Sequence, residues 1–304
     1  MYTQLAENLY WVGIVDWGLK HFHGRELSTH RGSTYNCYLV RDEKTALVDT
    51  VWEPFAQEFV ENVREVVDPS EIDYVIANHA EPDHSGGLPA LMRLCPDATV
   101  VVSKKGAESV PGHYHEQWNL RSVSTGDTIE LGKRTLTFVE APMLHWPDSM
   151  FTYVSPDGIL MPNDAFGQHY ATAFRFNDQV NRKELYEEAL KYYANILTPY
   201  SKQVIRKIDE LLGMELDVSM IAPSHGVIWR DQPLQIVEAY REWAEQKPQP
   251  RAIVLYDTMW DATRKMAEAI GDGLRDEDTD FKLFHMGVTD RNDVLTEVFQ
   301  SKAI

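Results

Sequence analysis

Seven histidine, aspartate and glutamate residues follow short apolar runs of the sequence and could together hold metal ions. In chain order they are His79, Glu81, Asp83, His84, His145, Asp164 and His225. The first four fall within six residues, directly after the strand-like run 73–77, where a loop is free to carry side chains that a packed sheet cannot. A single His–Glu pair on a loop is usually solvated, but seven such positions are hard to obtain by chance. This spacing predicts two adjacent metal ions in a narrow cleft.

The order of these residues resembles the metallo-β-lactamase superfamily, whose pattern is HxHxDH followed by a distant His, Asp and His. The resemblance covers roughly residues 1–245. Glu81 stands where hydrolases of that superfamily usually have a second histidine, and this difference resembles the flavodiiron proteins, whose signature is HxExDH. The resemblance implies one iron ion held by His79, Glu81 and His145, a second held by Asp83, His84 and His225, and Asp164 as the bridge. In that family the histidine at the position of His84 can also turn away from the metal, so its ligation stays open.

The donor atoms of these seven residues favour iron or manganese over the zinc of the hydrolases. Four imidazoles and three carboxylates are a harder, more oxygen-rich set than that of a zinc hydrolase, and they suit iron or manganese. The family resemblance implies a di-iron oxidoreductase that reduces O₂ to water, NO to N₂O, or both. Two other classes stay open: a binuclear zinc hydrolase of the same superfamily, and an iron-binding electron-transfer or gas-sensing module without turnover.

Other histidines and aromatic residues are candidates for supporting roles. By resemblance, His23 and Tyr193 lie just behind the metal ligands and contribute to catalysis from there. The pair His113 and His115 has no further ligand candidates nearby in sequence and is expected on a surface loop. His169 could line the pocket or have a structural role.

The first 247 residues are predicted to form two β-rich runs, each followed by helices. Apolar alternation between turn residues predicts strands, and apolar residues three and four apart predict helices. The predicted strands are 35–40, 45–51, 73–77, 99–102, 128–131, 135–140, 150–154, 158–161 and 218–222. The predicted helices are 55–67, 182–196, 202–212 and 232–246. This order indicates an α/β (α+β) fold of the αββα type, in which two sheets pack face to face with helices outside.

The polar, proline-containing stretch 245–250 is the clearest linker of the sequence, and the pattern changes after it. The remaining residues alternate strand, helix, strand and helix, at 251–256, 264–273, 281–286 and 290–300. This βαβα order predicts the start of a flavodoxin-like doubly wound sheet. We therefore expect two domains, 1–247 and 251–304, with two strands in the second domain and its first strand left unpaired.

A polar turn follows the predicted strand 251–256, at a place where backbone N–H groups and a helix N-terminus can hold a phosphate. No lysine of a GxxxxGK[ST] loop is present, which argues against a nucleoside triphosphate. Together with the HxExDH set, the turn resembles the first phosphate loop of the flavodoxin domain in flavodiiron proteins. The residues that this resemblance assigns to flavin mononucleotide (FMN) are Thr258, Met259, Trp260, Asp261, Ala262 and Thr263. A flavodoxin-like sheet has about five strands. We therefore expect a fragment, or a remainder supplied by another polypeptide, and FMN binding only when that domain is completed.

The family resemblance also implies partners. It implies a head-to-tail homodimer in which the flavin of one subunit faces the iron ions of the other, with Trp146 lining that contact. The electron donor expected by analogy is a rubredoxin or a reduced deazaflavin.

Composition and charge argue against several other classes. The chain has 47 acidic and 29 basic residues and a net charge of −18, which repels nucleic acids and anionic lipid surfaces. Cys37 and Cys95 stand far apart without a CxxC neighbour, so no disulfide framework is predicted. The first residues lack the pattern of a secretory signal, and no run approaches the ~18 apolar residues of a membrane span. We expect no nucleic-acid or membrane partner and a cytoplasmic location.

Overall fold

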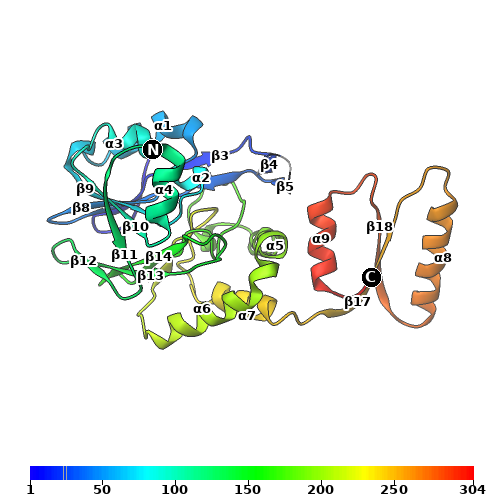
Figure 1. The fold of residues 1–304 in the computed structure, drawn as a ribbon. Coiled ribbons are helices and arrows are strands. Elements are labelled where there is room, and N and C mark those ends of the chain that lie inside the picture. The colour runs from blue at the N-terminus through cyan, green and yellow to red at the C-terminus, as the bar shows by residue number, and fades with distance from the viewer. Residues whose placement is uncertain (23, 25) are drawn as a thin grey trace.

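The computed structural model describes residues 1–22, 24 and 26–304 of the chain. His23, which was expected behind the metal ligands, lies outside the described residues. Two packed sheets with helices on their outer faces form the main body, and a smaller unit of strands and helices follows at the C-terminus (Figure 1). Among the described residues, no helix combines the length and the apolar character that crossing a membrane requires.

The first sheet is antiparallel at its N-terminal side and parallel at the other. Its strands, in spatial order, are β1 (Thr3–Ala6), β2 (Leu9–Trp11), β7 (Tyr38–Arg41), β8 (Thr45–Val48), β9 (Ile72–Ala77), β10 (Thr99–Ser103) and β11 (Asn119–Val123). The strands from β8 to β11 pair in parallel. The residues that follow β8 and β9 therefore leave the sheet at the same edge, where they can meet.

The second sheet is antiparallel except at one side. Its strands, in spatial order, are β12 (Thr128–Glu130), β13 (Thr135–Glu140), β14 (Met150–Ser155), β15 (Ile159–Met161) and β16 (Met220–Ile221). Because β15 and β16 pair in parallel, the segments that carry Asp164 and His225 also leave the sheet at one common edge.

Helices cover both outer faces of the two sheets. The helices near the first sheet are η1 (Glu53–Phe55), α1 (Ala56–Arg64), η2 (Pro69–Glu71), α2 (Pro82–Ser85), α3 (Leu88–Met92) and α4 (Gly106–Tyr114). Those near the second sheet are η3 (Asn177–Gln179), α5 (Arg182–Tyr192), the π-helical turn η4 (Tyr193–Leu197), η5 (Thr198–Tyr200), α6 (Ser201–Gly213) and α7 (Gln235–Ala244).

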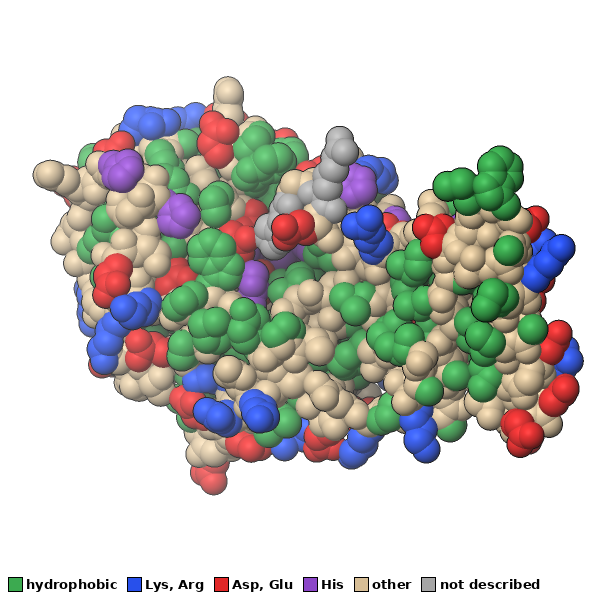
Figure 2. Space-filling view, turned by 45° about the vertical axis from the view of Figure 1, so that its right-hand side comes forward, with side chains coloured by type: hydrophobic (Ala, Val, Ile, Leu, Met, Phe, Trp, Pro, Cys, Tyr) green, Lys and Arg blue, Asp and Glu red, His purple; other side chains and the backbone are tan. Residues whose placement is uncertain are grey.

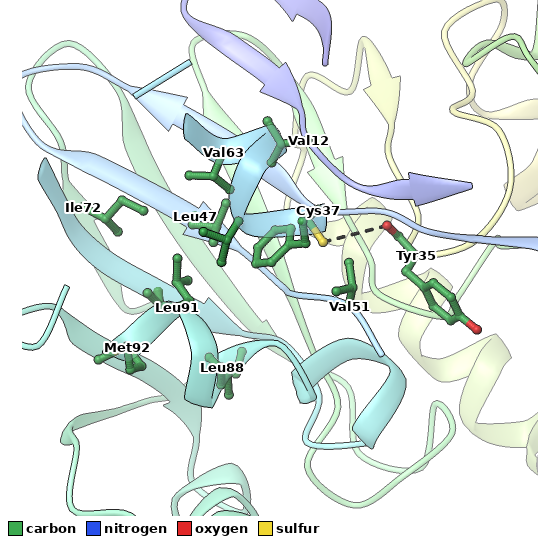
Figure 3. Packing of buried hydrophobic residues seen from close by; sticks show 14 of the residues in the cluster. Val12, Tyr35, Cys37, Leu47, Val51, Val63, Ile72, Leu88, Leu91 and Met92 are labelled. Carbon is green, nitrogen blue, oxygen red and sulfur yellow. Dashed lines mark hydrogen bonds between the residues drawn. The ribbon is translucent and has the colours of Figure 1, made fainter. Parts of the chain in front are cut away.

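Alternation along the strands sorts the buried apolar side chains into three layers. Within β7, Leu39 belongs to the layer under α1 and α3, whereas its neighbours Tyr38 and Val40 belong to the layer between the sheets. Figure 3 shows part of the first layer, in which Leu47 of β8 packs near Val63 of α1. The third layer lies between the second sheet and helices α5 to α7. The predicted αββα sandwich is confirmed.

The C-terminal unit contains a three-stranded parallel sheet. Its elements are β17 (Gln249–Tyr256), α8 (Ala262–Asp276), β18 (Asp280–His285), α9 (Arg291–Gln300) and β19 (Ser301–Ala303). β17 lies between β18 and β19 and pairs with both. The expectation of two strands with an unpaired first strand is therefore wrong, because the residues after α9 form a short third strand. The strand order 2-1-3 is the one that opens a flavodoxin-like doubly wound sheet.

The segment between β2 and β7 forms two small antiparallel pairs. β3 (Ile14–Asp16) pairs with β6 (Ser33–Tyr35), and β4 (His21–Phe22) pairs with β5 (Leu27–Ser28). The β4–β5 pair extends from the main body toward α9 of the C-terminal unit (Figure 1).

Phe138, between the two sheets, is fully buried, whereas Phe174 is 53% exposed. Phe138→Ala should lower the free energy of unfolding by about 3–5 kcal/mol, because it removes apolar burial and leaves a cavity. The matched Phe174→Ala should change it by less than about 0.5 kcal/mol. Urea unfolding followed by circular dichroism measures both, and equal losses would contradict the assigned core.

Candidate metal centre

Four segments bring the seven candidate ligands together at one edge of the sandwich. His79 follows β9, and Glu81 directly precedes α2, whose first residue is Pro82. Proline suits this position because its missing N–H would have no partner in the first helical turn. The remaining candidates are Asp83 and His84 in α2, His145 between β13 and β14, Asp164 after β15, and His225 after β16. His145 is partly buried and the other six are buried.

The candidates form two groups, each gathered around one point. The first group is His79, Glu81, His145 and Asp164. Glu81 Oε2 lies 3.1 Å from Nε2 of His79 and 3.4 Å from Nε2 of His145. The two imidazoles therefore present the same ring nitrogen to one carboxylate oxygen.

The second group is Asp83, His84 and His225, and all three are buried. Asp83 Oδ2 lies 3.2 Å from Nε2 of His84 and 3.1 Å from Nε2 of His225. As in the first group, two imidazole rings present Nε2 to one carboxylate oxygen.

Asp164 presents one carboxylate oxygen to each group. Its Oδ1 lies 3.0 Å from His84 Nε2 and 3.5 Å from His225 Nε2. Its Oδ2 lies 3.6 Å from His145 Nε2 and 3.8 Å from His79 Nε2. This is the placement that a carboxylate needs to bridge two metal ions.

Two observations fit metal ions: the separations between the ligand atoms, and buried polar atoms that make no hydrogen bond in the described part of the chain. Two ligand atoms at about 2.1 Å from one ion are about 3.0–3.4 Å apart at octahedral or tetrahedral angles, and the contacts of Glu81 and Asp83 fall in that range. Within the described residues, the carboxylate oxygens of Asp83 and the ring nitrogens of His84 are buried without a hydrogen bond of acceptable geometry. Buried polar atoms are rarely left in this state. The residues present therefore fit a two-metal site.

In the metal-free protein, protons on the histidines balance the carboxylates. Burial alone would lower the pKa of His79, but hydrogen bonds to Asp148 and Glu81 outweigh it and raise this pKa to about 9. Burial also opposes the charged form of His84, yet the neighbouring carboxylates raise its pKa well above the ordinary value. Burial would raise the pKa of Asp164, but the histidines around it, His84 first, hold it well below its usual range.

A buried aspartate just after β8 ties three ligand loops together. Asp49 Oδ1 accepts a hydrogen bond from the backbone N–H of Asn78 at 2.8 Å. Its Oδ2 accepts from the Ser224 hydroxyl at 3.3 Å and from Nδ2 of Asn163 at 3.4 Å. Each of these donors is the residue immediately before a candidate ligand. Asp49 therefore fixes the relative positions of three ligands without contacting a metal.

Two further groups orient ligand rings from behind. Asp148 Oδ1 lies 3.2 Å from Nδ1 of His79, and its Oδ2 accepts from the backbone N–H of Ala80 at 2.8 Å. Nδ1 of His225 donates to the backbone carbonyl of Thr34 at 2.6 Å. Engaging Nδ1 leaves Nε2 free to face the metal position.

Tyr192 lies next to the ligands, whereas Tyr193 packs away from them. The Tyr192 ring is 5.2 Å from that of His169 and 6.3 Å from that of His225. Burial raises the pKa of Tyr192 well above its ordinary value, so its hydroxyl stays protonated. The Tyr193 hydroxyl instead pairs with Ser201 Oγ at 3.1 Å, within the layer behind α5.

His169 and Trp146 each contact a ligand ring. His169 is buried and its ring lies 4.9 Å from that of His225. The Trp146 ring lies 5.1 Å from that of His79, edge to face. His113 is exposed near the end of α4, and its ring is 6.3 Å from that of Trp146.

A cavity of about 360 Å³ opens onto Glu81 and Asp83. Its other walls are Leu19, His21, Phe22, Gly24, Tyr35, Trp52 and Pro82. On the face shown in Figure 2, the main body is hollowed where histidine and acidic side chains come to the surface, with hydrophobic side chains at the border. The candidate metal centre is thus reached through a mainly apolar entrance.

The predicted FMN turn lies between β17 and α8. Its six residues run from the end of the strand into the first helical turn: Thr258, Met259, Trp260, Asp261, Ala262 and Thr263. Asp261 has a left-handed conformation with φ of 63°, and Met259 and Trp260 are 84% and 85% exposed. Figure 1 shows this turn well separated from α2, so one chain does not bring the two sites together.

Comparison with known proteins first defines the class of the main body. Residues 34–226 match the family model described as ODP family beta lactamase. The match includes all seven candidate ligands.

Longer relatives then define the family. The chain is 52% identical to the nitric oxide reductase of Moorella thermoacetica, over 99% of this chain and 75% of the relative. It is 50% identical to the anaerobic nitric oxide reductase flavorubredoxin of Klebsiella pneumoniae, over 99% of this chain but 63% of that relative. Its structure matches the rubredoxin oxygen:oxidoreductase of Desulfovibrio gigas with a TM-score of 0.96 and 39% identity, over 99% of this chain and 76% of that one. It matches the flavodiiron protein of Giardia intestinalis with a TM-score of 0.92 and 36% identity, over 98% and 72%. The chain belongs to the flavodiiron proteins.

Asp49→Ala should weaken metal binding at least about tenfold, because groups that orient ligands typically account for 10–100-fold in metal affinity. Asp97→Ala, which changes an exposed aspartate between α3 and β10, is the matched control and should leave the affinity unchanged. Competition with a chelator measures both, and circular dichroism confirms that the variants are folded. Equal metal affinity in the two variants would contradict the role of Asp49.

Metal uptake should release about two protons per chain at pH 7, because His79 and His84 have raised pKa values and must be neutral to bind metal. The contribution of His79 should disappear as the pH rises through about 9, since its ring then loses the proton before the metal arrives. Calorimetry in buffers of different ionisation enthalpy counts the protons. A release that stays constant from pH 7 to pH 10 would show that His79 is not one of the sources.

Proposed function

We propose that the chain is the di-iron part of an oxidoreductase that reduces nitric oxide to N₂O, dioxygen to water, or both. The observation that carries the proposal is the pair of buried groups, with Glu81 in the first and Asp164 facing both. A carboxylate at position 81 makes the set richer in oxygen and favours iron over zinc. The names of the relatives, nitric oxide reductase and rubredoxin oxygen:oxidoreductase, support the same class of reaction.

In this proposal each group holds one iron ion and Asp164 is shared between them. Iron bound there would supply the two electrons of 2 NO + 2 e⁻ + 2 H⁺ → N₂O + H₂O, whereas O₂ + 4 e⁻ + 4 H⁺ → 2 H₂O would need two more, which a reduced flavin would supply. Asp148 and the carbonyl of Thr34 hold the rings of His79 and His225 with Nε2 toward the metal positions. Asp49 keeps the ligand loops together from beneath.

The cavity supports a small, uncharged substrate. Phe22, Tyr35 and Trp52 give it apolar walls, and the described residues that line it include no lysine or arginine. Lactam, thioester and phosphodiester substrates of zinc hydrolases are larger and often anionic, so a cationic side chain would help to bind them. Nitric oxide and dioxygen need no such group.

We further propose that residues 1–247 and 251–304 are separate domains and that the second contributes to an FMN site when its sheet is complete. Because the turn 258–263 lies far from α2 in one chain (Figure 1), a head-to-tail homodimer would let the flavin of one subunit face the metal centre of the other, near Trp146. A rubredoxin or a reduced deazaflavin would then supply electrons to the flavin. The name of the D. gigas relative supports a rubredoxin.

Elemental analysis of chain purified without oxygen tests the proposal first. We expect about two iron ions per chain and, once the protein is reduced by dithionite with added FMN mediator, consumption of NO, O₂ or both above the mediator background. Asp164→Ala should release metal and abolish this consumption. Two zinc ions that persist after growth in iron-rich medium would favour a hydrolase, and iron without gas consumption would favour a sensing or electron-transfer module.

Glu81→His should shift the metal preference toward zinc and lower gas consumption at least about tenfold, because it restores a nitrogen-rich set. Glu108→His places the same change at an exposed position of α4 and should leave iron content and activity unchanged. Metal content and gas consumption are measured in both variants. Full iron and full activity in Glu81→His would count against the assignment of Glu81 as a ligand.

A further inference from the structure

The first turn of α9 in the C-terminal unit contacts two segments of the main body that border the metal centre. One is the β4–β5 pair with the residues that follow it. The other is the end of α5 with the π-helical turn η4. Figure 1 shows α9 on the side of the C-terminal unit that faces both.

Contacts with the first segment are hydrogen bonds between residues more than 260 positions apart. The backbone N–H of Ser28 donates to Asn292 Oδ1 at 2.9 Å, and the Ser28 hydroxyl donates to Asp290 Oδ1 at 2.8 Å. Nδ2 of Asn292 donates to the backbone carbonyl of Glu26 at 3.0 Å. The Asn292 side chain thus accepts a hydrogen bond from the backbone of this segment through Oδ1 and donates one to it through Nδ2.

Contacts with the second segment use the same side chain. Nδ2 of Asn292 donates to Asn195 Oδ1 at 2.8 Å, and Nδ2 of Asn195 donates back to the carbonyl of Asn292 at 3.2 Å and to Thr296 Oγ1 at 3.1 Å. The Lys191 ammonium pairs with Asp293 one residue further along α9. Asn195 lies in the π-helical turn, a feature frequent at functional sites.

Both segments carry an aromatic residue to the same pair of histidine rings. Phe22 of β4 lies 4.8 Å from the ring of His169 and 5.7 Å from that of His225. Tyr192, the last residue of α5, lies 5.2 Å and 6.3 Å from the same two rings. His225 is a candidate ligand, and Phe22 also lines the cavity.

The β4–β5 pair has little of its own to hold it in place. Among the described residues, two pairs form its ladder, His21 with Ser28 and Phe22 with Leu27, and an isolated two-stranded pair is marginally stable at best. Its position therefore depends on contacts from outside. Phe22 and Leu27 pack in the apolar layer of the first sheet, and α9 adds its hydrogen bonds to this segment.

We propose that Asn292 is a positioning residue of the metal centre. It holds the two segments in place, so that Phe22 and Tyr192 stay packed around His225 and Phe22 keeps its position in the cavity wall before a ligand enters. A wall ordered in advance binds more tightly than one that must be ordered on binding. The inference rests on one part of the proposed function, namely that the small substrate binds at the metal centre. It gives the C-terminal unit a second role beside flavin binding.

Asn292→Ala tests this role, with exposed Arg291→Ala in the same helical turn as the matched control. Hydrogen–deuterium exchange should rise in Asn292→Ala for peptides covering 26–30 and 191–197, and not in Arg291→Ala. In iron-loaded, oxidised protein, the dissociation constant of azide, followed by its visible absorption band, should rise about fivefold, a typical size for coupling between distant groups. Iron content should stay the same in wild type and both variants.

Unchanged exchange and unchanged azide affinity in Asn292→Ala would overturn the inference, as would an equal change in Arg291→Ala. Neither measurement requires turnover. A wild-type chain that binds iron and azide but consumes neither NO nor O₂ would overturn the proposed function alone. Exchange in metal-free protein keeps the inference testable even if iron does not bind.

Discussion

Crowding of carboxylates and imidazoles, nearly all of them buried, is the constraint on which the rest of this structure depends. The histidines around Asp164 hold its pKa well below its usual range, and the surrounding carboxylates raise the pKa values of His79 and His84. A buried charge left without a partner would cost several kcal/mol. The cleft must therefore always contain compensating cations, either protons on the rings or metal ions between them.

The sandwich meets this constraint by placing several strand ends at one edge. Parallel pairing of β8 with β9 and of β15 with β16 brings the ligand-bearing segments out of the two sheets together. Asp49 then joins these segments through hydrogen bonds to the residues just before the ligands. The sheets thus determine the backbone positions of the ligand residues. Asp148 and the carbonyl of Thr34 then orient the rings of His79 and His225.

The layer order could be predicted because the apolar runs have a clear period. The seven candidate ligands came from polar residues at strand ends together with the family resemblance, and the structure gathers them in two groups. Other features had weaker local signals. β19 has only three residues and exists because β17 offers an edge, which is a tertiary effect. Tyr192 and Tyr193 are both buried and lie three and four residues after Ala189. Helical spacing alone therefore does not tell which of them lies beside the ligands, and the family resemblance pointed to Tyr193. The hydrogen bond between Ser28 and Asn292 joins residues 264 positions apart, so no local sequence pattern predicts it.

The hydrogen bonds of Asp49 span 29, 114 and 175 positions of the chain. During synthesis, the cleft therefore cannot close until the segment containing Ser224 has left the ribosome and β16 has joined its sheet. Earlier in translation the HxExDH segment exists without its two distant histidines and without the bridging aspartate in place. A nascent chain at that stage would offer metal ions only an incomplete set of ligands. In this topology the complete set of candidate ligands exists only once most of the main body has been made.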